Sequence, residues 1–163
     1  MLAVTFEPAS ADDAEALVAI RIAAMRESLE RIGRFDPQRA RDRFLAHFDP
    51  ACTRHVLVDG AQAGFVVLRP QDDTWLLDHL YVLPSFQGRG IGAAVLRDVF
   101  ASADAHGRAL RVGALRESGA NRFYARHGFE LVGRTEWDNH YLRPAGAAPL
   151  VLGASGAHGT ITS

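Results

Sequence analysis

The stretch LYVLPSFQGRGIGAAVL, residues 80–96, tells more about the architecture than any other part of the sequence. An apolar run ends at Pro84, and three glycines then follow within five residues, at Gly88, Gly90 and Gly92. Apolar residues at helical spacing come next, so the glycines stand between a strand and the first turn of a helix. Bare glycines at a helix start leave successive backbone N–H groups open to a ligand. We therefore expect a turn whose main chain approaches another group closely.

The composition is that of an ordinary globular protein. The chain has 163 residues, enough for one domain, of which 48% are hydrophobic and 23% are charged. A net charge of -1 gives no general attraction to nucleic acid or to an acidic membrane surface. No apolar run reaches the length of a membrane span, and the N-terminus becomes polar early. We expect a cytoplasmic protein with neither nucleic-acid nor membrane partners.

Some residue types limit the available chemistry. The sequence contains no lysine, which excludes a lysine-based phosphate site and a lysine Schiff base. Cys52 is the single cysteine, so it cannot form an intramolecular disulfide. The seven histidines are scattered without metal-ligand spacing, and we expect no metal site.

The order of the expected elements indicates an α+β fold. Strands are expected at residues 2–9, 55–58, 65–68, 75–83, 110–115, 129–133 and 140–143. Helices are expected from Ser10 past Leu29, from Asp36 to Pro50, from the glycines to His106, and from Asn121 to His127. Val18, Ile22, Met25 and Leu29 mark the buried face of the first helix, and Asp59-Gly60 marks a tight hairpin turn.

These elements predict a mixed, mostly antiparallel central sheet of six or seven strands, flanked by about four helices and containing one parallel crossover. We expect a single domain at residues 1–144, followed by a tail at 145–163 that is rich in Gly, Ala and Ser. Within the tail, residues 149–152 are apolar enough to pair locally.

The glycines fit two ligand-binding patterns. Gly88-x-Gly90-x-x-Ala93 matches a loose dinucleotide fingerprint, with Glu117 about where a ribose-binding acid would stand. In that fold, however, the first glycine follows the strand directly and opens a repeated series of strand-helix-strand units. Here residues 84–87 intervene, and an antiparallel meander precedes them. The pattern therefore argues against a nicotinamide-dependent oxidoreductase.

The second pattern, Gln87-x-x-Gly90-x-Gly92 after a strand, resembles the acyl-CoA-binding motif of the GCN5-related N-acetyltransferase (GNAT) superfamily. The resemblance implies a GNAT-like fold in which backbone N–H groups and the helix dipole hold the pyrophosphate of acetyl-CoA. It also implies a bulge in the preceding strand, beside which the pantetheine arm inserts. The coenzyme-binding residues that it implies are Leu80, Tyr81, Val82, Gln87, Gly88, Arg89, Gly90, Ile91 and Gly92, with Asn121 as a weaker candidate. The alternative is a glycine-rich turn that binds nothing.

The segment NRFYARHGF, residues 121–129, resembles the second recognisable motif of the superfamily. The resemblance implies that Tyr124 protonates the departing thiolate, for which a phenol with a pKa of about 10 is suited. The alternative is an aromatic side chain that packs beside Phe123. Many members carry an asparagine seven residues before the tyrosine, where this chain has Glu117. Asn121 either replaces that contact to the pantetheine or caps the short helix.

The expected strand at 75–83 carries the candidates for a general base. Alternation places Leu76, Asp78 and Leu80 on one face, where a partly buried carboxylate would have a raised pKa. By resemblance this position accepts a proton from the amine through water, and Asp78 is the first candidate. The alternative is an ion pair between Asp78 and an arginine or histidine. His79 is the second candidate, on the opposite face unless a bulge shifts the phase.

We therefore expect an acyltransferase that moves an acetyl group from acetyl-CoA to a primary amine, by direct attack in a ternary complex. The acceptor, a small molecule or a peptide, is not identified by any motif, and the oligomeric state is open, with a homodimer as one option. The alternative from another class is a non-catalytic acyl-CoA sensor or interaction domain with the same fold.

Overall fold

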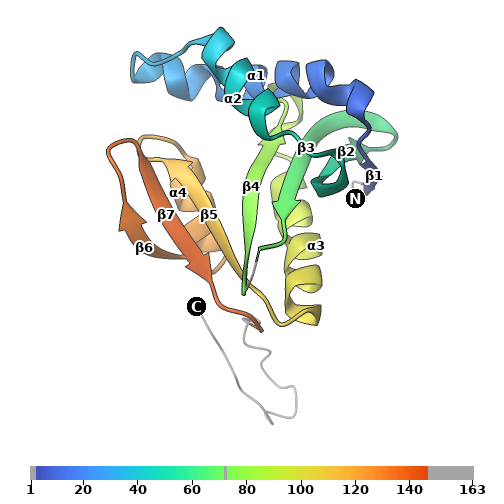
Figure 1. Cartoon of the computed structure of the whole chain (residues 1–163), viewed down its shortest axis with the longest axis vertical. Coiled ribbons are helices and arrows are strands. Elements are labelled where there is room, and N and C mark those ends of the chain that lie inside the picture. Colours follow the sequence, from blue (N-terminus) through green and yellow to red (C-terminus); the bar gives the residue numbers. More distant parts are fainter. Residues whose placement is uncertain (1–2, 72, 147–163) are drawn as a thin grey trace. The chain divides into compact units, whose positions relative to one another are not determined.

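The computed structural model describes residues 3–71 and 73–146, which contain seven β-strands and four α-helices (Figure 1). The first part of the chain forms β1 (Val4–Pro8), α1 (Ala14–Arg31), α2 (Pro37–His47), β2 (Thr53–Val58), β3 (Ala61–Arg69) and β4 (Thr74–Val82). The second part forms α3 (Ile91–Ala105), β5 (Ala109–Leu115), α4 (Ala120–Arg126), β6 (Glu130–Arg134) and β7 (Asp138–Arg143). The tail segment 149–152 lies outside the described residues.

The expected fold class is confirmed, because the seven strands belong to a mixed sheet accompanied by four α-helices. The described residues form two compact units. The first unit contains residues 3–69 and 77–98, and the second contains the described residues of 70–76 and 99–146. Both β4 and α3 contribute residues to the two units. The domain boundary at 144 stays a prediction.

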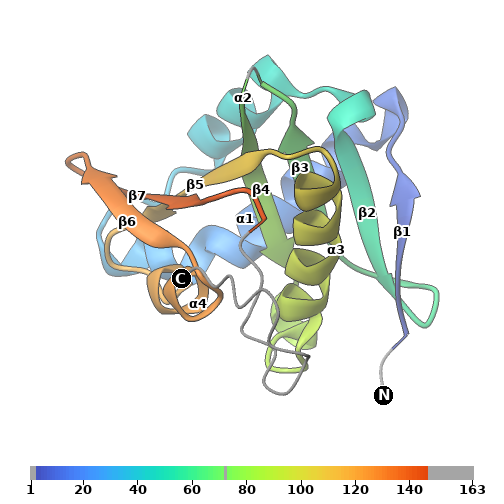
Figure 2. The same cartoon turned by 90° about the horizontal axis from the view of Figure 1, so that it is seen from below.

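In the first unit the strand order is β1-β2-β3-β4. The pairs β1–β2 and β2–β3 are antiparallel, and Figure 2 shows these three strands side by side. The hairpin between β2 and β3 turns through Asp59 and Gly60, whose φ angles are 50° and 84°. Two positive φ angles in a two-residue turn match the twist of the flanking strands, as the Asp-Gly sequence predicts.

The helices α1 and α2 pack against each other in the first unit, and α1 also contacts β3. Their core consists of Leu17, Val18, Ile20, Phe44, Phe65 and Val67. The predicted face of α1 is buried only in part, since Val18 lies in this core and Ile22 packs against it, whereas Met25 and Leu29 are half-buried. The buried residues of α1 all lie in its first half, and they include the charged side chain of Arg21.

A close approach between β3 and β4 fixes a glycine at position 64. A Cβ atom on Gly64 would lie 2.0 Å from the carbonyl oxygen of Tyr81 and 3.1 Å from the Cα atom of Val82. The pairing of β3 with β2 shifts register at this level, where Val56 lies opposite Gly64 but its successor Leu57 lies opposite Gln62. The main chain of β3 is therefore irregular beside the end of β4.

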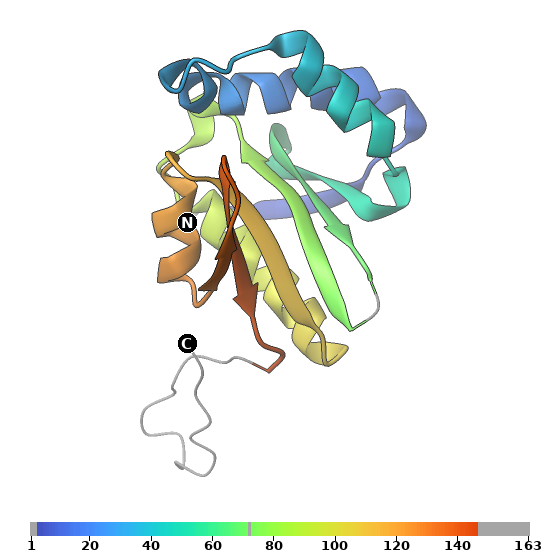
Figure 3. The same cartoon turned by 60° about the vertical axis from the view of Figure 1, so that its left-hand side comes forward.

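In the second unit β7 lies between β5 and β6, and both pairs are antiparallel. Figure 3 shows these three strands with α4 beside them. Arg143 at the end of β7 is only 3% exposed and donates to both carboxylate oxygens of Asp104, at 2.9 and 3.0 Å. Its guanidinium carbon lies 3.9 Å from the ring centroid of Phe100, so this buried charge is both paired and stacked.

Ion pairs in this protein use arginine or histidine as the cation, because the sequence contains no lysine. Arg54 on β2 donates to Asp98 on α3 at 2.7 Å, and Arg41 donates to Glu15 at 2.6 Å. Among the described residues, no helix has both the length and the apolar character that a membrane span requires.

Candidate active site

The turn between β4 and α3 has the conformation that its glycines suggest. After β4 ends, residues 84–86 form a single turn of 3-10 helix, and α3 begins at Ile91. Gly88 and Gly90 adopt φ angles of 78° and 77°, in the left-handed region where a side chain would be strained. Residues 87–90 are exposed, whereas Ile91 is buried and fixes the start of the helix.

The backbone N–H groups of this turn lack backbone acceptors among the described residues. In the described part of the chain, no backbone acceptor bonds the N–H groups of residues 88–93, and the first such bond runs from Ala94 to the carbonyl of Gly90, at 3.1 Å. A Cβ atom on Gly88 or Gly90 would meet nothing within 4 Å, so the space in front of the turn is open. The helix dipole adds partial positive charge at the same place. These residues fit a pyrophosphate group.

The side chains of the turn support its shape and its charge. Gln87 donates from Nε2 to the carbonyl oxygen of Val82 at 3.0 Å, which ties the turn to the end of β4. Arg89 is exposed, and its guanidinium carbon lies 5.3 Å from the ring centroid of Phe86. Arg89 therefore leaves its charge available beside the exposed N–H groups.

The end of β4 contains the segment predicted to hold the pantetheine arm. Leu80, Tyr81 and Val82 are all half-buried. The N–H group of Leu83 donates to the carbonyl of Ala63 at 2.8 Å, which joins β3 to this end of β4. The carbonyl oxygen of Tyr81 lies only 2.0 Å from the point that a Cβ atom on Gly64 would occupy. Contacts of this segment with a coenzyme stay a prediction.

Asp78, the first candidate for a general base, forms an ion pair within the first unit. Its Oδ2 atom accepts a hydrogen bond of 2.7 Å from Nε of Arg69, and the carboxylate is 30% exposed. The ion pair is thus the alternative that the sequence left open. One oxygen of the candidate base is therefore already occupied by a charge-assisted hydrogen bond from Arg69.

His79, the second candidate, lies among aromatic side chains. Its ring centroid is 5.5 Å from those of Phe44 and Tyr81, and Nε2 is 3.7 Å from Oδ2 of Asp78. Burial lowers the pKa of His79 to about 4, although the carboxylate of Asp78 opposes the shift. The imidazole is therefore neutral at pH 7, with a lone pair that accepts a proton only weakly.

In the second unit, Tyr124 lies on α4 and is 6% exposed. Its ring makes an edge contact with Phe129 at 5.4 Å between centroids, and lies 6.4 Å from the ring of Tyr141. The N–H group of Phe129 donates to the carbonyl of Tyr124 at 3.1 Å, after Gly128 reverses the chain with φ 93°. The packing fixes the ring, and the acid role of its phenol stays a prediction.

Asn121 holds together the loop before α4 and the strand β7. Its Nδ2 group donates to the carbonyl of Leu115 at 2.7 Å and to that of Ser118 at 2.9 Å. Its Oδ1 atom accepts from Asn139 and from Tyr141, both at 2.8 Å. A contact from the amide of Asn121 to the pantetheine would have to displace one of these bonds. In this structure the side chain joins the loop before α4 to β7.

The exposed loop before α4 borders an open hollow of about 440 Å³, which is lined by Arg116, Glu117, Ser118, Gly119, Asn121 and Arg122. The Glu117 position, where many GNAT members have asparagine, belongs to this hollow. Within residues 3–71 and 73–146, no group of three or more His, Cys, Asp or Glu side chains is arranged to bind a metal ion.

Three residues that contact β4 or act on its His79 are not apparent from the motifs: Arg21, Gly64 and Arg69. A signal existed for Arg21, which stands four residues after Leu17 and four before Met25, on the apolar side of α1. A glycine inside a strand pattern, as at Gly64, indicates a close backbone approach. Arg69 gives no local signal, because its pairing depends on the alignment of β3 with β4.

A family model for the acetyltransferase (GNAT) domain matches residues 51–131, which contain the glycine turn and Tyr124. Uncharacterized N-acetyltransferases of Mycobacterium bovis and Mycobacterium tuberculosis are 39% identical over 79 residues. That match covers 46% of this chain and 50% of each relative, so the chain spans about half the length of the curated relatives it matches.

Solved structures share the fold across nearly the whole chain. The PaiA N-acetyltransferase of Thermoplasma acidophilum, in complex with coenzyme A, superposes with a TM-score of 0.69 at 17% identity, covering 87% of this chain and 99% of that one. The ribosomal-protein-S18-alanine N-acetyltransferase of Escherichia coli superposes with a TM-score of 0.68 at 17% identity, covering 92% and 99%. At such identities the likeness shows the fold.

The sheet, the glycine turn before α3 and the family match define an acetyltransferase class of domain. The chain belongs to the GNAT superfamily.

Proposed function

We propose that this protein is an N-acetyltransferase that transfers an acetyl group from acetyl-CoA to a primary amine. The observation that carries the proposal is the turn at residues 88–93, whose backbone N–H groups have no backbone acceptor among the described residues. Acetyl-CoA supplies the reactive thioester and a pyrophosphate that suits this turn. The name of the Thermoplasma structure, which contains coenzyme A, supports the same ligand class.

The proposed reaction is a direct attack. The amine nitrogen forms a bond to the acetyl carbon, the carbon–sulfur bond breaks, and the amine loses one proton while the thiolate gains one. Tyr124 donates the proton to the thiolate, for which a phenol is a suitable acid. This role requires that its hydroxyl face the bound thioester. Cys52 takes no part, since burial and the nearby Asp49 raise the pKa of its thiol and disfavour the thiolate.

The reaction also needs a group that accepts the proton from the amine. Asp78 already accepts a hydrogen bond from Arg69, and His79, with a pKa of about 4, is a weak base. We propose that water carries the proton away, with Asp78 and His79 orienting it. kcat/KM should then rise with pH until it reaches the pKa of the free amine, with no step near pH 6.5.

Two measurements test this function. Calorimetry should show binding of acetyl-CoA and of free coenzyme A, and Gly90→Ala should weaken both because the left-handed backbone at this position excludes a side chain without strain. Thioester consumption should accelerate when a primary amine is added. An absence of coenzyme binding, tested at millimolar concentration, would refute the assignment of the turn.

One observation favours a second function, a non-catalytic acyl-CoA sensor with the same fold. Asp78 is held in an ion pair with Arg69, and His79 has a low pKa. A sensor would tolerate both features, and a fast enzyme would not. A sensor binds acetyl-CoA and leaves it intact with every amine of a broad panel, whereas an enzyme consumes it with at least one of them. Turnover therefore separates the two functions, while binding alone does not.

A further inference from the structure

Arg21 on α1 is a buried cation whose hydrogen-bond partners, among the described residues, are neutral. The residue is 9% exposed. Its Nε group donates to the sulfur of Met25 at 3.2 Å, and Nη1 donates to the carbonyl of Ala40 at 3.1 Å. A guanidinium has five N–H donors and is seldom buried without a counter-charge, because desolvating an unpaired charge costs several kcal/mol.

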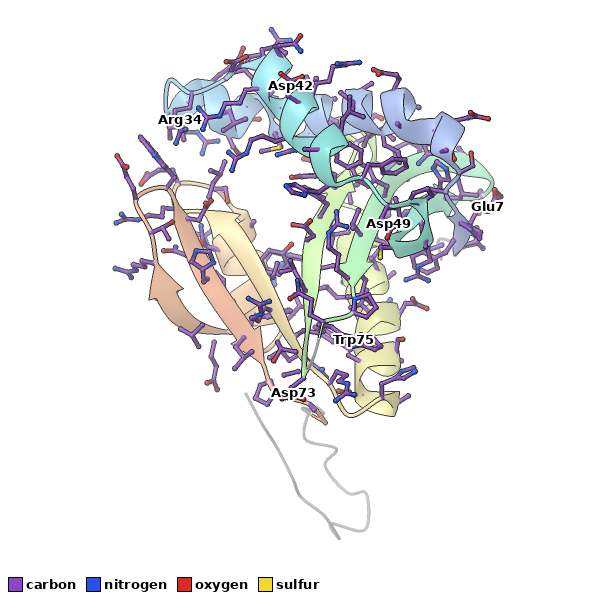
Figure 4. The ribbon with its side chains drawn as sticks, viewed as in Figure 1. Glu7, Arg34, Asp42, Asp49, Asp73 and Trp75 are labelled. Atoms are coloured by element: carbon purple, nitrogen blue, oxygen red, sulfur yellow. The ribbon has the colours of Figure 1, made fainter. Side chains whose placement is uncertain are left out.

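The acidic side chains of the two neighbouring helices have other partners. Glu15 pairs with Arg41, Glu27 with Arg31 and Glu30 with Arg26, while Asp36 accepts from the N–H of Arg39 and Asp42 from Gln38. All of these acids are exposed, and Figure 4 shows Asp42 on the outer side of α2. Neither α1 nor α2 therefore supplies a carboxylate to Arg21.

Arg21 lies in the neighbourhood of His79, since Arg21 donates to the carbonyl of Ala40, one turn before Phe44 on α2, and the ring of Phe44 lies 5.5 Å from that of His79. Burial is the main cause of the low pKa of His79, and the charges of Arg21 and Arg69 add to it. With His79 neutral, the two arginines and the carboxylate of Asp78 sum to one excess positive charge. The aromatic rings around His79 keep the surroundings poor in water, where a charge interaction is strong. One added anion would neutralise the group.

We propose that Arg21 binds a carboxylate of the acceptor, so that the acceptor is a small amine that also carries a carboxylate, as amino acids do. The inference rests on the proposed function and narrows its substrate class. A carboxylate matches the planar fork of a guanidinium, which can donate two parallel hydrogen bonds to it. The same positive charge disfavours a polyamine, whose second ammonium group would be repelled.

Matched acceptors test the inference in the wild-type protein. Acetyl-CoA consumption is measured with the common α-amino acids, with the amide of each, with phenethylamine and with spermidine. At least one amino acid should have a kcat/KM about tenfold or more above that of its own amide, and spermidine should be poor. The comparison needs no variant, so it decides the question even if substitution at position 21 prevents folding.

Substitution then assigns the effect to Arg21. Arg21→Met keeps much of the apolar stem and removes the charge, and we expect KM for the amino acid to rise about 10- to 100-fold while KM for the amide stays unchanged. Arg26→Met is the matched control, because Arg26 lies on the same helix but is exposed and pairs with Glu30. Thermal unfolding and coenzyme calorimetry check that both variants fold.

Each outcome supports or overturns the inference. Equal use of amino acids and their amides overturns it, and so does an Arg21→Met variant that impairs both equally, since Arg21 would then only join α1 to α2. If coenzyme A binds but no amine is acetylated, the enzymatic function fails and the inference fails with it. If amines without a carboxylate are preferred, the enzymatic function stands and only the carboxylate site is refuted.

Discussion

Gly64→Ala should destabilise the protein and also disturb the end of β4, the segment that we propose binds the coenzyme. The added Cβ atom would lie 2.0 Å from the carbonyl oxygen of Tyr81 and 3.0 Å from its carbonyl carbon. A carbon and an oxygen in ordinary contact are about 3.3 Å or more apart, so the two strands must separate by about 1 Å. The clashing group is main chain, which cannot rotate away as a side chain would.

The expected cost follows from this geometry. Overpacking of a rigid site costs up to about 3 kcal/mol, and at this chain length about 3 kcal/mol lowers the melting temperature by roughly 6–12 °C. Gly113→Ala in β5 is the matched control, because its new Cβ would lie 3.6 Å from the ring of His140, an ordinary contact. Neither glycine has a positive φ, so the comparison isolates the steric effect.

Denaturant titration of the two variants and the wild type measures the difference, and calorimetry with coenzyme A measures the effect on the site. Coenzyme affinity should fall in Gly64→Ala, since Tyr81 and Val82 must move, and should be unchanged in Gly113→Ala. If Gly64→Ala unfolds within about 0.5 kcal/mol of the wild type, the close approach does not fix this glycine and the account of the strand is wrong.

Three further predictions concern single side chains. Tyr124→Phe should lower kcat while leaving coenzyme affinity unchanged, because only the proton donor is lost; equal turnover in a steady-state assay would remove its role. As pH falls from about 6.5 to 4, the unfolded chain takes up a proton that folded His79 refuses, so the free energy of unfolding should fall by about 3 kcal/mol. The free energy of unfolding, measured by denaturant titration at several pH values in this window, should depend less steeply on pH in His79→Gln than in the wild type. An equal pH dependence in the two proteins would contradict the low pKa of His79. Asp104→Asn removes the carboxylate that pairs with buried Arg143 and should cost about 3 kcal/mol, whereas thermal unfolding like that of the wild type would show the pair to be dispensable.

The elements that the sequence predicts well are those whose signals are local. Asp59-Gly60 forms the expected hairpin turn, and Gly107 and Gly128 end their helices with positive φ angles of 65° and 93°. Asp36 accepts from the N–H of Arg39 as the expected N-cap. Each of these features depends on a few neighbouring residues, so propensity and hydrogen bonding within the segment are enough to specify it.

Features that depend on distant partners were beyond local patterns. The position of β7 between β5 and β6 follows from pairing across the sheet, and the burial of Arg21 follows from the packing of α2 over α1. For Asp78 the pattern located a half-buried carboxylate but could not choose between a base and an ion pair. That choice depended on Arg69, nine residues away on the adjacent strand.

The absence of lysine, which leaves arginine and histidine as the cations of the ion pairs, has a practical consequence. An N-acetyltransferase acts on primary amines, and a chain without lysine has no side-chain amine to offer as a target. The proposed enzyme would therefore have no side-chain amine of its own to acetylate, however long it is incubated with the acetyl donor. Mass spectrometry should find no acetylated side-chain nitrogen, and loss of thioester without an added acceptor would not report side-chain self-labelling.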